Sequence, residues 1–82
     1  YSNFPNPFNS STSIKVLLNK RGNIQINIFN LKGENIETLS KNNLNKGVNY
    51  FKWVPDKIPS GVYFLKLNFD NYVQTQKVLF VK

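Results

Sequence analysis

The sequence predicts an all-β domain, an immunoglobulin-like antiparallel β-sandwich of about seven short strands over residues 1–82. Apolar and polar residues alternate in short runs with a period of two rather than 3.6. Turn residues divide these runs at a spacing of roughly ten residues. No stretch carries the apolar stripe of an amphipathic helix. An oligonucleotide-binding barrel or a jelly-roll fragment is the next choice, but two facing sheets suit strands with one apolar face better.

The first two full strands show the clearest alternation. Residues 14–18 place Ile, Val and Leu side chains on one face, and the polar residues 19–23 then turn the chain. In residues 24–29 three isoleucines face inward, whereas Gln25 and Asn27 face outward. This pattern is typical of a half-buried antiparallel strand.

The next segment predicts a hairpin with an irregular second strand. Residues 30–34 form a tight turn in which Gly33 supplies the positive φ. Ile36 and Leu39 follow three positions apart, so we expect a bulge in this weaker strand. The polar residues 41–47 are expected to form a loop.

The run 48–53 predicts a strand with Phe51 and Trp53 on one face and Tyr50 and Lys52 on the other. Two prolines then make residues 54–61 a crossing loop, because proline has no N–H for a sheet ladder.

The last two strands flank a turn at Asp70 and Asn71. Residues 62–69 are almost continuously apolar, which predicts a central strand covered on both faces. Residues 72–82 predict a final strand whose end is apolar on both faces.

The residues that carry most enzyme chemistry are missing. The chain has no histidine or cysteine, so it has no general base near neutrality, no thiolate and no imidazole metal ligand. Its acids, Glu34, Glu37, Asp56 and Asp70, fall in separate turns, and its glycines form no phosphate-binding loop. We therefore expect no enzyme activity, no metal and no cofactor.

The formal net charge of +7 raises the question of a polyanionic partner. All but one of the eleven basic residues are lysines, and they are dispersed along the chain. Arginine, which pairs bidentately with phosphate and guanine, occurs once, so we expect no nucleic-acid partner. No apolar stretch reaches the roughly 20 residues of a transmembrane helix.

Aromatic residues have two interpretations. Trp53 and most phenylalanines are expected to fill a small core. Tyr50 and Tyr72 are candidates to face a ligand, with Phe29 as a further candidate. For the two tyrosines, core packing and ligand contact remain equally good explanations.

The N-terminal FPNPFN stretch is expected to be a docked edge rather than a linker. Pro5 and Pro7 stiffen the chain, which lowers the entropy lost on docking. Phe4 and Phe8 provide two apolar anchors, whereas flexible linkers use glycine and serine. We expect Phe8 to be substantially buried.

Four stretches, in this order, resemble the C-terminal sorting domain of proteins exported by the type IX secretion system. They are FPNPFNSSTSIKVLL at 4–18, INIFNLKGENIETL at 26–39, PSGVYFLKL at 59–67 and KVLFVK at 77–82. The middle and SGVY segments are also similar to the related immunoglobulin-like domain of flagellar hook-capping proteins.

The resemblance implies a non-catalytic sorting signal at the C-terminal end of a longer secreted protein. Such a domain folds as a seven-stranded β-sandwich in the periplasm of a Gram-negative bacterium. It is recognised by the outer-membrane type IX translocon and is often removed by a sortase-like peptidase. The cargo is then released or joined to anionic lipopolysaccharide at the cell surface.

The recognition motifs of this family fall on three parts of the sequence: Pro5, Asn6 and Pro7; Gly61 and Tyr63; and the closing residues Lys77, Val78, Leu79, Phe80, Val81 and Lys82. Fold support and partner recognition both remain open as roles for Gly61 and Tyr63. The alternative function is a carbohydrate-binding or structural module appended to an extracellular enzyme, and the oligomeric state stays open.

Overall fold

The structure is a computed structural model that describes residues 2–3 and 11–82. Over these residues, all regular secondary structure is strand. The strands are β1 (Ser2–Asn3), β2 (Thr12–Leu18), β3 (Gly22–Phe29), β4 (Asn35–Leu44), β5 (Gly47–Trp53), β6 (Gly61–Phe69) and β7 (Tyr72–Phe80).

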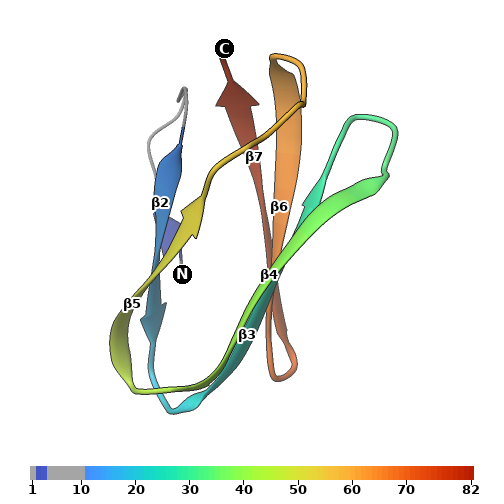
Figure 1. Ribbon diagram of the computed structural model, residues 1–82. Helices are drawn as coiled ribbons and strands as arrows, with labels where there is room; N and C mark the ends of the chain where they lie inside the picture. The colour runs from blue at the N-terminus through green and yellow to red at the C-terminus, as the bar shows by residue number, and fades with distance from the viewer. Residues whose placement is uncertain (1, 4–10) are drawn as a thin grey trace.

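The strands form two antiparallel sheets that face each other as two layers (Figure 1). One sheet has the order β1-β2-β5 and the other β4-β3-β6-β7. The prediction of an antiparallel β-sandwich of about seven strands is therefore confirmed. In the constant-type immunoglobulin arrangement the fourth strand joins the sheet of the first, second and fifth strands. Here β4 lies beside β3 instead.

The core lies between the sheets and is built by the predicted alternation. The isoleucines of β3 and the apolar residues of β2 that were expected to face inward are all buried. Phe51 and Trp53 on β5 and Tyr63 on β6 complete the centre of the core. Each buried large side chain stabilises the fold by roughly 1.5–3 kcal/mol.

The turn between β3 and β4 is organised by Asn30 as well as by Gly33. The Asn30 Oδ1 atom accepts hydrogen bonds from the backbone N–H groups of Lys32 (2.9 Å) and Glu34 (3.0 Å). Gly33 adopts a φ of 83°, as predicted, and its N–H donates to the Asn30 carbonyl. The side chain of Asn30 thus replaces the ladder bonds that end here.

The predicted irregularity of the fourth strand is confirmed at Ile36. Ile28 pairs with Glu37 and Phe29 pairs with Asn35, so Ile36 is the extra residue of a bulge. Leu39 packs against the core, whereas Ile36 lies at the surface.

The prediction of a loop over 41–47 was wrong for its first part, because β4 continues to Leu44. Lys41 pairs with Ile24, and Leu44 pairs with Gly22. β4 is the edge strand of its sheet, and most of its side chains are exposed. Such a strand needs no alternation of apolar and polar residues, so its polar sequence did not indicate a strand. At the register shift, the backbone N–H of Asn43 donates to Asn23 Oδ1 at 2.8 Å.

Gly22 is the residue of β3 that lets the Phe69 ring approach the backbone. A Cβ atom at this position would collide with the Cε1 atom of Phe69. A larger residue at position 22 would therefore force the buried Phe69 ring to shift. Glycine at this position permits close packing and does not adopt an unusual φ.

The prediction that β6 is covered on both faces was also wrong. The strand is interior in its sheet, between β3 and β7, but only one of its faces lies in the core. On the other face Val62 and Phe64 are half-buried and Lys66 is exposed. The continuous apolar run arises because this outer face also carries large apolar residues, as described below.

Candidate functional site

Two of the stretches singled out in the sequence lie side by side in the structure. The start of β6 pairs with the end of β7, with Gly61 opposite Phe80 and Tyr63 opposite Val78. Beyond the strand end, the backbone N–H of Lys82 donates to Ser60 Oγ at 2.8 Å. Residues about twenty positions apart in the chain therefore form one surface and one part of the core.

The inward side chains of this region belong to the core. Tyr63, Val78 and Phe80 are all buried. The Tyr63 ring meets the Trp53 ring edge-on at a centroid distance of 6.1 Å. In the folded domain these three side chains cannot contact a partner, so the structure gives them a structural role.

Tyr63 also anchors the crossing loop. Its Oη atom donates a hydrogen bond of 2.6 Å to the carbonyl of Pro59, four residues upstream. This contact resembles the tyrosine corner of immunoglobulin-like sandwiches, in which a tyrosine hydroxyl bonds to the backbone a few residues upstream. The sequence signal was present, since Tyr63 follows closely on a proline-containing crossover, but the sequence alone left its role open.

Burial raises the pKa of the Tyr63 phenol above its ordinary value of about 10. The unfolded chain releases this proton near pH 10, and the folded chain holds it to a higher pH. The contribution of the protonated Tyr63 phenol to the free energy of unfolding is therefore complete below pH 10 and is lost as the pH rises through the folded-state pKa. We expect the free energy of unfolding, measured with urea, to fall between pH 8 and pH 11.

The matched control for this pH dependence is Tyr63→Phe, which keeps the ring and every other titratable group. At pH 8 it should cost about 1 kcal/mol for the lost hydrogen bond. Its further loss between pH 8 and pH 11 should be smaller than that of the unsubstituted protein. Equal losses in both proteins would show that Tyr63 does not cause the effect.

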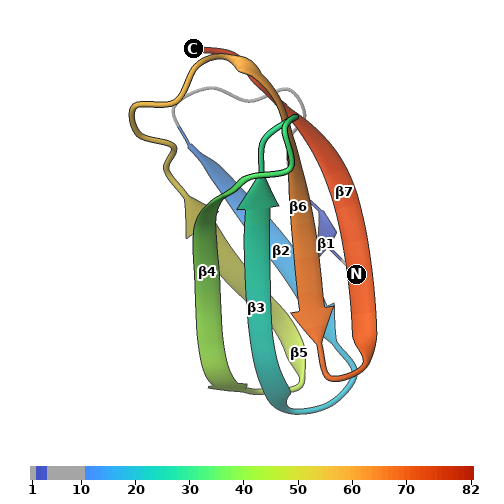
Figure 2. The ribbon, with the colours of Figure 1, turned by 90° about the vertical axis from the view of Figure 1, so that its right-hand side faces the viewer.

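The outward side chains of the same region form an apolar surface, which we call the outer patch. Register places Val62 opposite Leu79, Phe64 opposite Lys77, and Phe29 of β3 opposite Phe64. Leu79 is 39% exposed, and Lys77 is also exposed. These strands are adjacent on the face that Figure 2 presents to the viewer. The outer patch comprises Phe29, Val62, Phe64, Lys77 and Leu79.

Val81 and Lys82 follow the outer-patch strand directly in the chain, beyond the end of β7. Both are exposed, and Val81 follows Leu79 by two positions. The six closing residues singled out in the sequence thus divide into two buried side chains and four exposed ones. Sequence reasoning missed the contribution of β3 and of Val62 and Phe64, because it depends on strand order.

The remaining predicted recognition residues lie outside the described part of the chain. These are Pro5, Asn6 and Pro7. Phe4 and Phe8, the expected apolar anchors of the docked edge, lie in the same undescribed stretch, so the predicted burial of Phe8 also falls outside the described residues.

The candidate ligand-facing tyrosines do not share a surface. Tyr50 is 57% exposed on the outer face of the β1-β2-β5 sheet, opposite Lys15 in the pairing. Tyr72 is 52% exposed and lines a cleft at the start of β7. Phe29 belongs to the outer patch. No two of the three form a stacking platform for a sugar.

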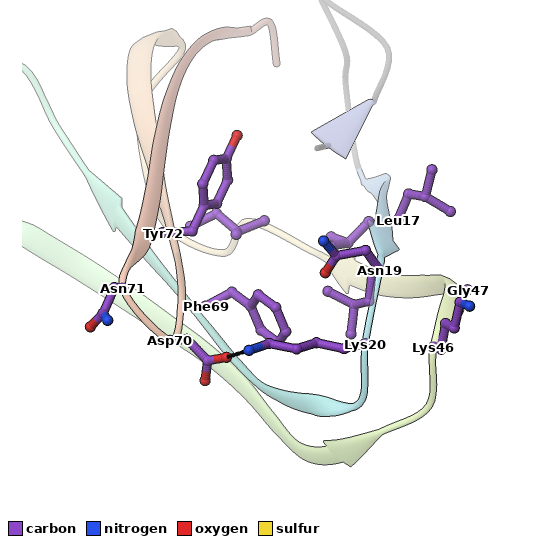
Figure 3. A pocket seen from close by; sticks show the side chains of 12 residues that line it. Leu17, Asn19, Lys20, Lys46, Gly47, Phe69, Asp70, Asn71 and Tyr72 are labelled. Carbon is purple, nitrogen blue, oxygen red and sulfur yellow. Dashed lines mark ion pairs between the residues drawn. The ribbon is translucent and has the colours of Figure 1, made fainter.

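The cleft at Tyr72 has a volume of about 810 Å³ and lies between the two sheets (Figure 3). Its polar rim includes Asn19, Asn71 and an ion pair of 3.0 Å between Lys20 Nζ and Asp70 Oδ2. The ion pair joins the β2–β3 turn to the β6–β7 turn. Nothing in the sequence indicated this cleft, because its walls come from turns far apart in the chain.

Three of the four acidic residues, Glu34, Glu37 and Asp70, are engaged in structural contacts rather than paired with each other. Glu34 Oε1 accepts from Asn30 Nδ2 at 2.7 Å, and Glu37 Oε1 accepts from Trp53 Nε1 at 3.1 Å.

Within residues 2–3 and 11–82 no group of three or more metal-ligating side chains gathers. The described part of the chain also holds no helix long and apolar enough to span a membrane.

Comparison with known proteins gives one family. The sequence model of the secretion system C-terminal sorting domain matches residues 2–82. A search of curated proteins gave no match to the chain.

Proposed function

The chain belongs to the family of secretion system C-terminal sorting domains, and from this premise we propose that the outer patch is the surface through which the type IX translocon recognises it. The domain then directs a cargo protein across the outer membrane. Recognition would involve Lys77, Leu79, Val81 and Lys82, whereas Val78, Phe80 and Tyr63 would act by holding the strands in place.

The observation that carries this proposal is the pairing of two motif stretches into one exposed apolar surface. Val62 and Phe64 stand beside Leu79 and Lys77, so the outer patch combines both stretches. Contiguous exposed apolar patches mark protein interaction sites. Membership of the family supports the type IX machinery as the partner, and the exposed apolar surface supports the outer patch as the place of contact.

Cleavage and surface attachment form the second part of the proposal. After translocation, a sortase-like peptidase would remove the domain, and the cargo would be released or joined to anionic lipopolysaccharide at the cell surface. The domain itself would contribute no catalytic group, because the four acids available occupy turns and structural contacts. Pro5, Asn6, Pro7 and Gly61 remain further candidates for recognition by the translocon.

The carbohydrate-binding alternative has less support. It requires exposed aromatic rings on one surface, and Tyr50 and Tyr72 lie on different ones.

A charged substitution in the outer patch tests whether this surface is needed for secretion. Leu79→Asp in the full-length protein should lower the extracellular fraction about tenfold, because a carboxylate in an apolar contact costs well over 1.4 kcal/mol. The matched control is Val73→Asp, which changes an exposed residue on the same face of the same strand, six positions away. Secretion is measured by immunoblotting of cell and medium fractions.

Folding is checked separately by urea unfolding of both variants. Because Leu79 and Val73 are exposed, each change should shift the free energy of unfolding by only about 1 kcal/mol or less. If Leu79→Asp and Val73→Asp were secreted equally well, the outer patch would not be the recognition surface.

A further inference from the structure

The two lateral sides of the sandwich are closed to different extents. On the β4–β5 side, Glu37 accepts from the Trp53 indole, and Lys41 Nζ donates to the Tyr50 carbonyl at 2.7 Å. Lys41 also lies 5.0 Å from the centre of the Phe51 ring. On the β2–β7 side, the cleft of about 810 Å³ opens between the sheets. At its mouth, among the described residues, the Lys20–Asp70 ion pair connects the β2–β3 turn to the β6–β7 turn.

The interior of the cleft is apolar. Val16 and Leu18 of β2 and Leu67 and Phe69 of β6 line it, and all four belong to the core cluster. Figure 3 shows Tyr72 and Phe69 on one wall and Asn19 and Lys20 across from them. A cleft with such a lining suits an apolar side chain and disfavours a buried charge.

Burial along β7 decreases toward the cleft. The alternate residues that face inward are fully buried at Val78, half-buried at Gln74 and 52% exposed at Tyr72. The start of β7 therefore turns an inner face toward the other sheet, where the described part of the chain provides little cover.

The register of β1 points along this cleft. Ser2 pairs with Val16 and Asn3 with Lys15, in antiparallel orientation. On its other side, β2 is paired with β5 as far as Leu18. If this register were extended, a residue two positions upstream of Ser2 would stand opposite Leu18. Directly paired residues point to the same face of a sheet, so its side chain would enter the cleft beside Leu18.

We propose that the cleft receives the chain segment directly upstream of this sequence in the full-length protein. That segment continues β1 along β2, and the residue opposite Leu18 places an apolar side chain between Leu18 and Tyr72. The inference rests on the proposed function, since a C-terminal sorting domain is preceded by its cargo. The sorting domain and the end of the cargo linker then form one packed unit.

The test is cysteine accessibility in the full-length protein. The sequence contains no cysteine, so Tyr72→Cys creates a single thiol at the cleft, and peptide mapping identifies its product with N-ethylmaleimide. With the natural upstream residues, labelling should be at least about fivefold slower than when the six residues upstream of Tyr1 are replaced by Gly and Ser. Asn71→Cys at the rim repeats the measurement with Tyr72 intact.

The matched control is Val73→Cys, which should label equally in both proteins because Val73 faces the outer side. Aspartate at the position two residues upstream of Ser2 should restore fast labelling of Tyr72→Cys. Aspartate at either neighbouring position, for example Tyr1→Asp, should leave the labelling of Tyr72→Cys slow. This alternation distinguishes a paired strand from nonspecific cover.

Equal labelling of Tyr72→Cys with the natural and the Gly-Ser segments would overturn the proposal. Protection that increases with protein concentration would also overturn it, because a second copy would then fill the cleft. Labelling requires no secretion, so this result is independent of the Leu79→Asp experiment. Failure of one leaves the other intact.

Discussion

Trp53→Ala is expected to lower the free energy of unfolding by about 3–5 kcal/mol, which is most of the stability of a domain this small. Trp53 is 0% exposed and meets Tyr63 edge-on. Its indole N–H also donates to Glu37 across the sheets. The substitution removes a ring from the centre of the core and the bond that joins β4 to β5. Urea unfolding followed by circular dichroism measures the loss.

Trp53→Phe is the matched variant for this prediction. It keeps an aromatic ring in the core but removes the hydrogen bond to Glu37 and some volume, so it should cost about 1–3 kcal/mol. A Glu37→Gln change keeps an acceptor for the indole and should have a smaller effect. If Trp53→Ala unfolded at the same urea concentration as the unsubstituted protein, the placement of this ring would be wrong.

Deletion of residues 77–82 is expected to unfold the domain. The deletion removes Val78 and Phe80 from the core and the pairing of β7 with Gly61, Tyr63 and Phe64. Two buried apolar side chains and the end of a strand together exceed about 5 kcal/mol. The expected result is the loss of the cooperative urea transition and of slow amide hydrogen exchange.

This deletion also affects how secretion experiments are designed. A truncated chain that fails to be secreted has lost both its outer patch and its core, so the defect does not identify a recognition residue. Leu79→Asp changes the outer patch and leaves the core residues in place. If the protein lacking residues 77–82 kept a cooperative unfolding transition, the closing residues would be dispensable for folding and the truncation would become informative.

Much of the fold could be predicted because large apolar residues recur at every second position of β2, β3 and the end of β5. In those strands one face meets the core, so the period of two directly reflects burial. The edge strand β4 escaped prediction beyond Ser40, since its side chains are mostly exposed and its pairing depends on the backbone. The start of β6 was misjudged for the opposite reason, because Val62 and Phe64 are apolar without being fully covered.

Part of the candidate site could be proposed from the sequence, but the face on which each of its side chains lies could not. The motif residues at 61–63 and 77–82 could be identified from the chain, yet which of them are buried follows from the register of β6 against β7. Phe29 joins the outer patch through β3, and the cleft at Tyr72 combines three turns. Such long-range neighbours are set by sheet order, which no local pattern in this sequence specifies.

The pairing of β6 with β7 determines when the outer patch can form. The surface formed by Val62, Phe64 and Leu79 exists only after the residues up to Phe80 have been made and have folded. Pairings between distant strands, such as β2 with β5, also delay completion of the core. If the outer patch is recognised as proposed, a prematurely terminated chain would lack this surface and would not be exported.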